Sequence, residues 1–162
     1  MKLMSDGLCS GICEQIGHEI YNANLYLFIC GFLRNKGLDN IAKHFEEQHS
    51  EETGHAKEFF NLLTDMNADV AIPEISEINI QINSIHDVAK LYLERELLTT
   101  DSIYELRIMA MGEKNPVVEE KMRDMISKQQ KEYSEATTFM DKAELMPEWW
   151  QCALWDASGG AI

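Results

Sequence analysis

The sequence Glu51-Glu52-Thr53-Gly54-His55 stands in the middle of a long segment that has the apolar spacing of an amphipathic helix. Glu52 and His55 are three residues apart, so on a helix their side chains are neighbours on one face, with Cβ atoms roughly 5–6 Å apart. A carboxylate and an imidazole at that distance can bind one metal ion, and Glu-x-x-His is a ligand pair of carboxylate-bridged di-metal helix bundles. The stretch therefore predicts a metal site inside an all-α fold.

The same segment contains a second Glu-x-x-His, from Glu46 to His49, and helical geometry separates the two pairs. At about 100° per residue, the apolar residues of the segment fall within about 40° of Glu52, whereas Glu46 lies about 120° away. These apolar residues are Ile41, Phe45, Ala56, Phe59, Leu63 and Met66. A carboxylate in the centre of an apolar face must be paired or bind a metal ion. Glu52 and His55 are thus the candidate ligands, and Glu46 is expected on the solvated surface.

Helical patterns of similar length cover most of the chain. They run from about Leu8 to Lys36, from after Asp39 to Met66, from after Ser84 to Gly112, and from Pro116 to about Leu145. Asp39, Ser84 and Asn115 are the expected N-caps, because their short polar side chains can accept a hydrogen bond from the first turn. Gly37 suits a left-handed C-terminal cap of the first helix.

The connection at residues 67–83 contains Pro73 and has no sustained helical period. Such a long connection is uncommon inside a compact domain, and it fits two parallel helices that the chain must join across the full length of a bundle. We therefore predict an all-α four-helix bundle at residues 1–145, with a long crossover between the second and third helices. Residues 146–162 are expected to form a short C-terminal helix with Pro147 at its first position, or else a Trp-rich docking tail.

Each of the other three helices also has a polar residue at mid-length within its apolar stripe: Glu19, Glu96 and Gln129, with Glu132 one turn further. The stripes consist of Ile12, Ala23, Tyr26, Cys30 and Leu33; of Ile85, Ala89, Tyr92 and Ile103; and of Val118, Met122, Met125, Tyr133, Ala136 and Met140. Mid-helix residues of antiparallel neighbours meet at one level, and buried carboxylates without compensation cost several kcal/mol each. Two divalent cations would compensate them. Oxygen ligands with one imidazole suit iron or manganese better than thiolate-binding metals, although zinc and copper would also bind.

Composition narrows the range of partners. The 162 residues include 28 Asp and Glu against 14 Lys and Arg, a net charge of −14, so nucleic acid is not an expected partner and cations are. No apolar run is long enough to span a membrane, and the first residues lead into no signal-peptide core. Cys9, Cys13, Cys30 and Cys152 sit in helical patterns, which favours reduced thiols in the cytoplasm. Cys9 and Cys13 could share a metal ion, or simply pack.

Across about residues 13–145 these residues and spacings resemble the non-haem, bacterial-type ferritins. The resemblance implies iron storage and detoxification by a ferroxidase centre within one chain, with O₂ or H₂O₂ as oxidant and a ferric mineral as product. The implied site residues are Glu19, Glu52 and His55 for one iron ion, Glu52 and Glu96 for the other, Gln129 close by, Tyr26 as a hydrogen-bond donor to a ligand, and Glu51 and Glu132 at a possible third iron position.

Differences from relatives refine this expectation. Bacterioferritins carry a second Glu-x-x-His on the last helix, where this chain has Gln129-Gln130-Lys131-Glu132. Thr53 stands where haem-binding members have Met, so no haem is expected. Lys128 and Lys131 stand where bacterial ferritins often have Glu, which argues against a filled third iron position. Asp124 replaces a frequent aromatic residue near the site.

A second apolar line on the first helix, formed by Leu25, Phe28 and Phe32 with Tyr21 nearby, is expected to form a two-fold dimer. The resemblance implies that such dimers build a hollow homo-oligomeric shell of roughly 24 subunits. Two other functions stay open at this point. The chain would be a di-iron enzyme acting on an organic substrate if a pocket lies beside the metal ions, or a non-catalytic helical bundle that binds partners through its tail.

Overall fold

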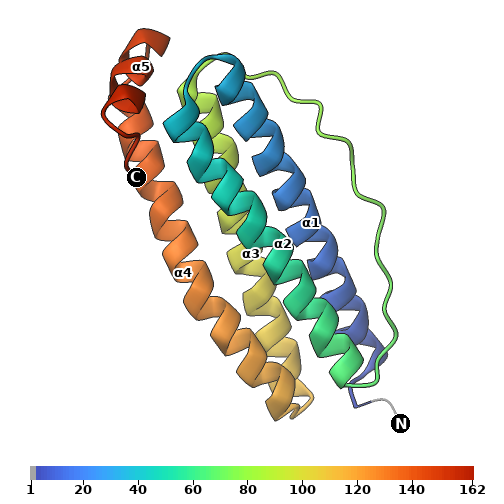
Figure 1. The fold of residues 1–162 in the computed structure, drawn as a ribbon. Coiled ribbons are helices and arrows are strands. Elements are labelled where there is room, and N and C mark those ends of the chain that lie inside the picture. The colour runs from blue at the N-terminus through green and yellow to red at the C-terminus, as the bar shows by residue number, and fades with distance from the viewer. Residues whose placement is uncertain (1–2) are drawn as a thin grey trace.

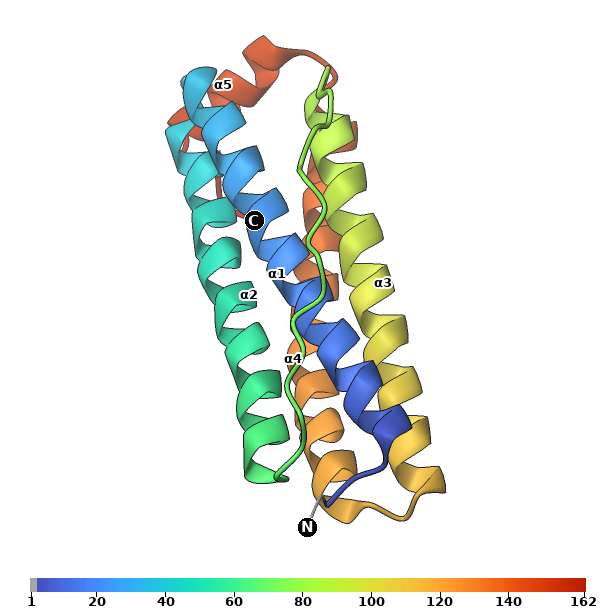
Figure 2. The same cartoon turned by 90° about the vertical axis from the view of Figure 1, so that its right-hand side faces the viewer.

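The computed structural model describes residues 3–162, which form five helices and no strand. The long helices are α1 (Asp6–Asn35), α2 (Asp39–Asp65), α3 (Ile85–Gly112) and α4 (Pro116–Glu144), and the short one is α5 (Trp149–Ala157). The long helices lie side by side, and α5 lies across the end of the bundle where α2 begins (Figures 1 and 2). The predicted four-helix bundle with a C-terminal helix is confirmed. Within residues 3–162, no helix is long and apolar enough to span a membrane.

The crossover runs along the whole bundle beside α1 and α3, because α2 and α3 point in the same direction (Figure 2). Its first part is packed closely on α1: a Cβ added to Gly17 would lie only 2.4 Å from Cγ of Pro73. The thiol of Cys9 donates a hydrogen bond to the backbone oxygen of Asp69 at 3.1 Å, and Cys13 Sγ lies 3.8 Å from the same oxygen. Of the two roles left open for these thiols, the structure therefore supports packing.

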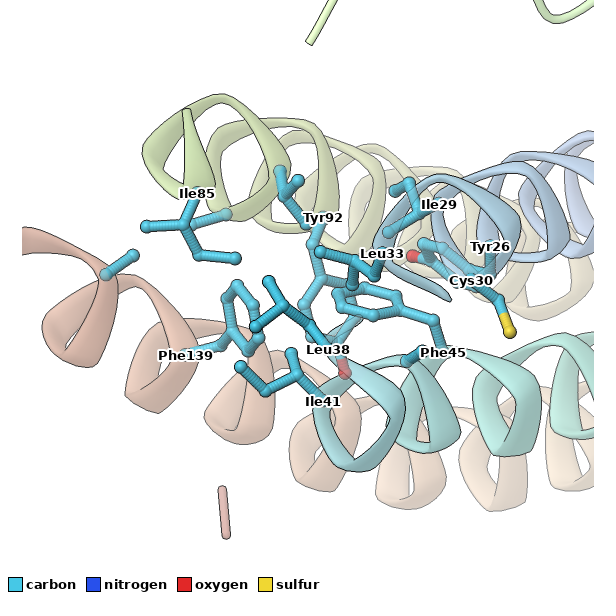
Figure 3. Close-up of a cluster of buried hydrophobic side chains, with 14 of the residues drawn as sticks. Tyr26, Ile29, Cys30, Leu33, Leu38, Ile41, Phe45, Ile85, Tyr92 and Phe139 are labelled. Carbon is cyan, nitrogen blue, oxygen red and sulfur yellow. The ribbon is translucent and has the colours of Figure 1, made fainter. Parts of the chain in front are cut away.

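The core consists of two apolar clusters separated by a polar layer, and every long helix contributes to all three. One cluster lies toward α5 and includes Tyr26, Phe45, Tyr92 and Phe139 (Figure 3). The other lies toward the opposite end of the bundle and includes Ile12, Phe59, Ile103 and Met122. The buried polar residues between them are Gln15, Glu19, Asn22, Gln48, Glu52, His55, Glu96, Thr99, Gln129 and Glu132.

Two predictions about buried faces are wrong. Tyr133 is 38% exposed, and Phe139 is buried instead. The buried residues of α4 follow spacings of alternately four and three residues, as in a coiled coil, so its inner face drifts from the straight wheel by about 20° per heptad. Leu25 is fully buried within the subunit, in a cluster against which Ile78 and Ile80 of the crossover pack, so it is not part of an outer dimer face.

The start of α2 is capped from a distant part of the chain. The helix begins at Asp39, and Leu38 is its N-cap without a side-chain hydrogen bond, so the prediction of Asp39 as N-cap is wrong by one residue. The turn that ends α1 is short and places Leu38 directly before the first helical residue. The missing acceptor comes from α5, because Asp156 Oδ1 accepts a hydrogen bond from the backbone N–H of Ile41 at 2.7 Å. Asn40 Nδ2 also donates to the backbone oxygen of Asp156 at 2.9 Å.

The tail helix starts later than predicted. Glu148 is its N-cap, and its side chain forms a capping box with Gln151, so Pro147 lies before the helix rather than at its first position. Trp149 packs on Phe32 and Trp155 packs on Phe139, with ring centroids 5.9 and 5.5 Å apart. Two of the three tryptophans therefore attach the tail to the bundle.

We predict that Asp156→Ala lowers the free energy of unfolding by about 1–2 kcal/mol, because the first turn of α2 loses the side-chain acceptor that Asp156 provides. Asp156→Asn keeps an acceptor oxygen and should retain most of the stability. Asp141→Ala on the exposed face of α4 is the matched control. Urea unfolding followed by circular dichroism measures the difference, and equal loss in Asp156→Ala and Asp141→Ala would contradict the capping role.

Candidate metal centre

The polar residues predicted from the sequence meet in the middle of the bundle. Glu19 lies on α1, Glu52 and His55 on α2, Glu96 on α3, and Gln129 and Glu132 on α4. All six are buried, with exposed fractions between 0% and 8%. Glu51, which was also predicted as a site residue, is exposed.

The ligand atoms form two overlapping groups. One oxygen each of Glu19 and Glu52 and one ring nitrogen of His55 lie within 4.8 Å of one another, and so do single oxygens of Glu52, Glu96 and Glu132. Glu52 belongs to both groups, so its two oxygens can bridge two ions. Ring nitrogens of His55 lie 3.3 Å from a Glu52 oxygen and 3.4 Å from a Glu132 oxygen. This arrangement can hold two cations that share one carboxylate.

Several carboxylate oxygens in this cluster have no hydrogen-bond partner. They are Oε2 of Glu19, Oε1 of Glu52 and Oε2 of Glu132, and each is buried. A buried acceptor left without a partner costs about 1–3 kcal/mol, and more when it carries charge. Because the orphaned oxygens belong to residues of the two overlapping groups, one cation bound in each group would give them partners. The oxygen-rich donor set with one imidazole fits iron.

Burial raises the pKa of every carboxyl group in the cluster, since the charged form is poorly solvated. The pKa of Glu96 rises to about 7. That of Glu132 rises to about 9, and the charges of Glu96 and Glu19 add to the effect of burial. The pKa values of Glu19 and Glu52 are also raised, mainly by burial. Without cations, the site therefore retains protons at neutral pH, and cations would displace them.

Neighbouring side chains hold the carboxylates in place. Tyr26 donates a hydrogen bond from its hydroxyl to Glu96 Oε1, and Gln129 donates from its amide to Glu96 Oε2. Gln15, one turn before Glu19 on α1, donates to Glu19 Oε1 at 2.7 Å. Both oxygens of Glu96 and one of Glu19 are thus oriented before any ion binds, while the remaining oxygens stay available.

Four buried polar residues of this layer were missed by the sequence reasoning: Gln15, Asn22, Gln48 and Thr99. Gln15 and Asn22 lie four residues before and three after Glu19, on the same face of α1, and this spacing is the signal that would have found them. Gln48 occupies the corresponding place one turn before Glu52 on α2. Its Nε2 lies 3.4 Å from Glu51 Oε2 and 3.4 Å from Glu135 Oε2, at the edge of the cluster.

The two residues predicted for a third iron position, Glu51 and Glu132, do not lie in one ligand group. Glu132 groups with Glu52 and Glu96, whereas Glu51 lies outside both groups. Lys131 lies 3.5 Å from Glu135, and Lys128 pairs with Glu58 at 2.7 Å. The other Glu-x-x-His of α2, from Glu46 to His49, lies outside the cluster. As predicted, Glu46 is on the surface, where it pairs with Arg34 at 2.7 Å.

Comparison with known proteins shows that both the sequence and the fold are similar to those of ferritins. Residues 10–146 match the model of the ferritin-like domain. The chain is 29% identical over 133 residues to ferritin BfrB of Mycolicibacterium smegmatis, covering 82% of this chain and 74% of the relative. It is 28% identical over 135 residues to the bacterial non-heme ferritin of Campylobacter jejuni, covering 83% and 81%. The crystal structure of the open pore ferritin from Archaeoglobus fulgidus superimposes with a TM-score of 0.92 at 25% identity, over 100% of this chain and 99% of that one.

We predict that the metal-free protein becomes less stable as the pH rises from about 5 to 9. A carboxyl group whose folded-state pKa is raised stabilises the fold while it is protonated, and this contribution is lost as the pH passes its folded-state pKa. Glu96 and Glu132 reach that point near pH 7 and pH 9, at up to about 1.4 kcal/mol per pH unit for each group. Urea unfolding of metal-free protein across this range measures the slope.

Glu132→Gln, which keeps the shape and removes the titration, should flatten the slope in the upper half of the range. Glu144→Gln, at an exposed position of the same helix, is the control and should leave the slope unchanged. A wild-type stability that is constant from pH 5 to 9 would contradict the prediction.

Proposed function

Since the chain belongs to the ferritin family, we propose that it is a ferroxidase that oxidises Fe(II) and stores the product as a ferric mineral. Iron is the substrate. Two Fe(II) ions per subunit each give one electron, and the pair of electrons reduces O₂ to H₂O₂, or H₂O₂ to water, with protons taken from solvent. Two-metal sites generally hold their ions about 3.5–4 Å apart, so that one oxidant can reach both.

The observation that carries the proposal is the pair of overlapping ligand groups that share Glu52. Glu19, Glu52 and His55 would hold one ion, and Glu52 with Glu96 the other, with Glu132 also within reach of the second. Tyr26 and Gln129 hold the two oxygens of Glu96, so the second ion meets an oriented ligand. Gln15 does the same for Glu19.

The proposal extends to assembly and location. A hollow 24-subunit shell made of two-fold dimers would place the mineral inside. The partly buried rings of Tyr21 and Phe28 on α1 would contribute to such contacts, whereas Phe32 already packs on Trp149. The four free, buried cysteines suit the reducing cytoplasm. The net charge of −14 would concentrate Fe²⁺ around the shell.

An anaerobic Fe(II) titration followed by addition of oxygen tests the function. We expect rapid oxidation that saturates near two iron ions per chain, read from near-ultraviolet absorbance. Glu52→Ala should lose the fast phase completely because both ions lose a ligand, and His55→Ala should lose most of it. Glu46→Ala, a surface carboxylate on the same helix, is the matched control and should behave as wild type. Slow oxidation that is equal in all four proteins would contradict the proposal.

A further inference from the structure

A small pocket lies between α3 and α4, outside the ligand cluster. It has a volume of about 180 Å³, and the residues that define it include Leu97, Thr100, Tyr104, Ile126, Gln129 and Tyr133. Every residue that lines it is uncharged, and its surface is mostly apolar. This volume is below the roughly 300–1,000 Å³ of pockets that enclose drug-sized ligands. The pocket therefore suits a molecule of very few atoms rather than an organic substrate.

The charge of its lining distinguishes this pocket from a second cavity, on the other side of the ligand cluster. Between α2, α4 and residues 159–162 a polar cavity of about 320 Å³ is lined by the carboxylates of Glu47, Glu51 and Glu135 together with Lys43 and Lys131. The carboxylates of that cavity offer oxygen ligands to a cation, whereas an uncharged apolar wall offers an iron ion nothing to replace its hydration shell. In a chain with a net charge of −14, an uncharged pocket beside the cluster is matched to a neutral, apolar molecule.

One side chain, that of Gln129, contacts both the pocket and the ligand cluster. Gln129 lines the pocket, is 2% exposed, and donates hydrogen bonds to Glu96 Oε2 and to the backbone oxygen of Glu96. The hydroxyl of Thr100 donates to the same backbone oxygen at 2.8 Å, so this hydroxyl already has a hydrogen-bond partner. The side chain of Gln129 thus lies between the pocket and the carboxylate of Glu96, and two hydrogen bonds hold it there.

We propose that this pocket binds dioxygen and is its route to the ferroxidase centre, so that the two substrates approach from different faces. The inference rests on the proposed ferroxidase function. Apolar cavities in proteins take up small apolar guests such as xenon. This pocket opens to solvent at Leu97, Tyr104 and Tyr133, which are 38–42% exposed, so a dissolved gas can enter it from outside. Gln129 then separates the gas-binding pocket from the oxygen ligands, and movement of its side chain admits oxygen to the ions.

Xenon serves as the probe of the pocket, independent of activity. Crystals of the wild-type protein under xenon pressure should show anomalous density between Thr100 and Ile126. Thr100→Phe fills the pocket and should abolish this density, while Thr100→Val keeps the volume, removes the same hydroxyl, and should retain it. Leu97→Trp is a second filling variant at a 42% exposed position, where a larger side chain is easily tolerated.

Steady-state oxidation at varied oxygen concentration is the second readout. The filled variants should raise KM for oxygen several-fold, with unchanged kcat at saturating oxygen and unchanged anaerobic Fe(II) binding, and Thr100→Val should match wild type. Absence of xenon from the wild-type pocket, or an unchanged KM in both filled variants, would overturn the oxygen route while ferroxidase activity stands. A wild-type protein that binds two Fe(II) ions and consumes no oxygen would instead overturn the proposed function, and the oxygen route with it.

Discussion

The structure depends on a layer of carboxylates placed where an apolar core would otherwise be continuous. Glu19, Glu52, Glu96 and Glu132 are nearly inaccessible to solvent, and three of them have oxygens without a partner. Their charges can be balanced only by protons, by His55, or by cations. Because burial raises the pKa of all four carboxyl groups, we expect them to retain protons when no cation is bound. The apolar clusters on both sides supply the stability that lets the fold carry this layer.

The topology of the bundle brings the polar residues of this layer together. A shared site needs each helix to present its polar residue at the same height, and the four long helices do so because all have a similar length and a mid-length polar residue. Parallel α2 and α3 require the long crossover, which is held against α1 where Gly17 faces Pro73. At the far end, Asp156 joins α5 to the first turn of α2 and so fixes the helix that carries Glu52 and His55.

The fold and most of the cluster could be predicted because their causes are local in the sequence. Glu19, Glu52 and Glu96 are polar residues in apolar helical stripes, and that contrast survives small errors in helix geometry. Glu132 was harder to place beside the others, because the inner face of α4 follows a period near 3.5 residues and a straight wheel favours Tyr133. The cap from Asp156 joins residues 115 positions apart, and no local pattern reports such a contact. The pocket beside Gln129 depends on how α3 and α4 pack, which the sequence alone does not specify.

The energetic cost of the carboxylate layer indicates that its role is to bind cations rather than to stabilise the fold. Replacing buried charged groups by well-packed apolar residues of similar volume is often neutral or stabilising by about 1–4 kcal/mol. A bundle selected for stability alone would therefore join its two apolar clusters through the middle. This chain instead keeps four carboxylates there. Gln15, Tyr26 and Gln129 orient two of them, Glu19 and Glu96, and leave oxygens of the others free. Side chains that are held in place yet incompletely satisfied have the properties of a binding site, because the energy released when a cation completes them becomes binding energy.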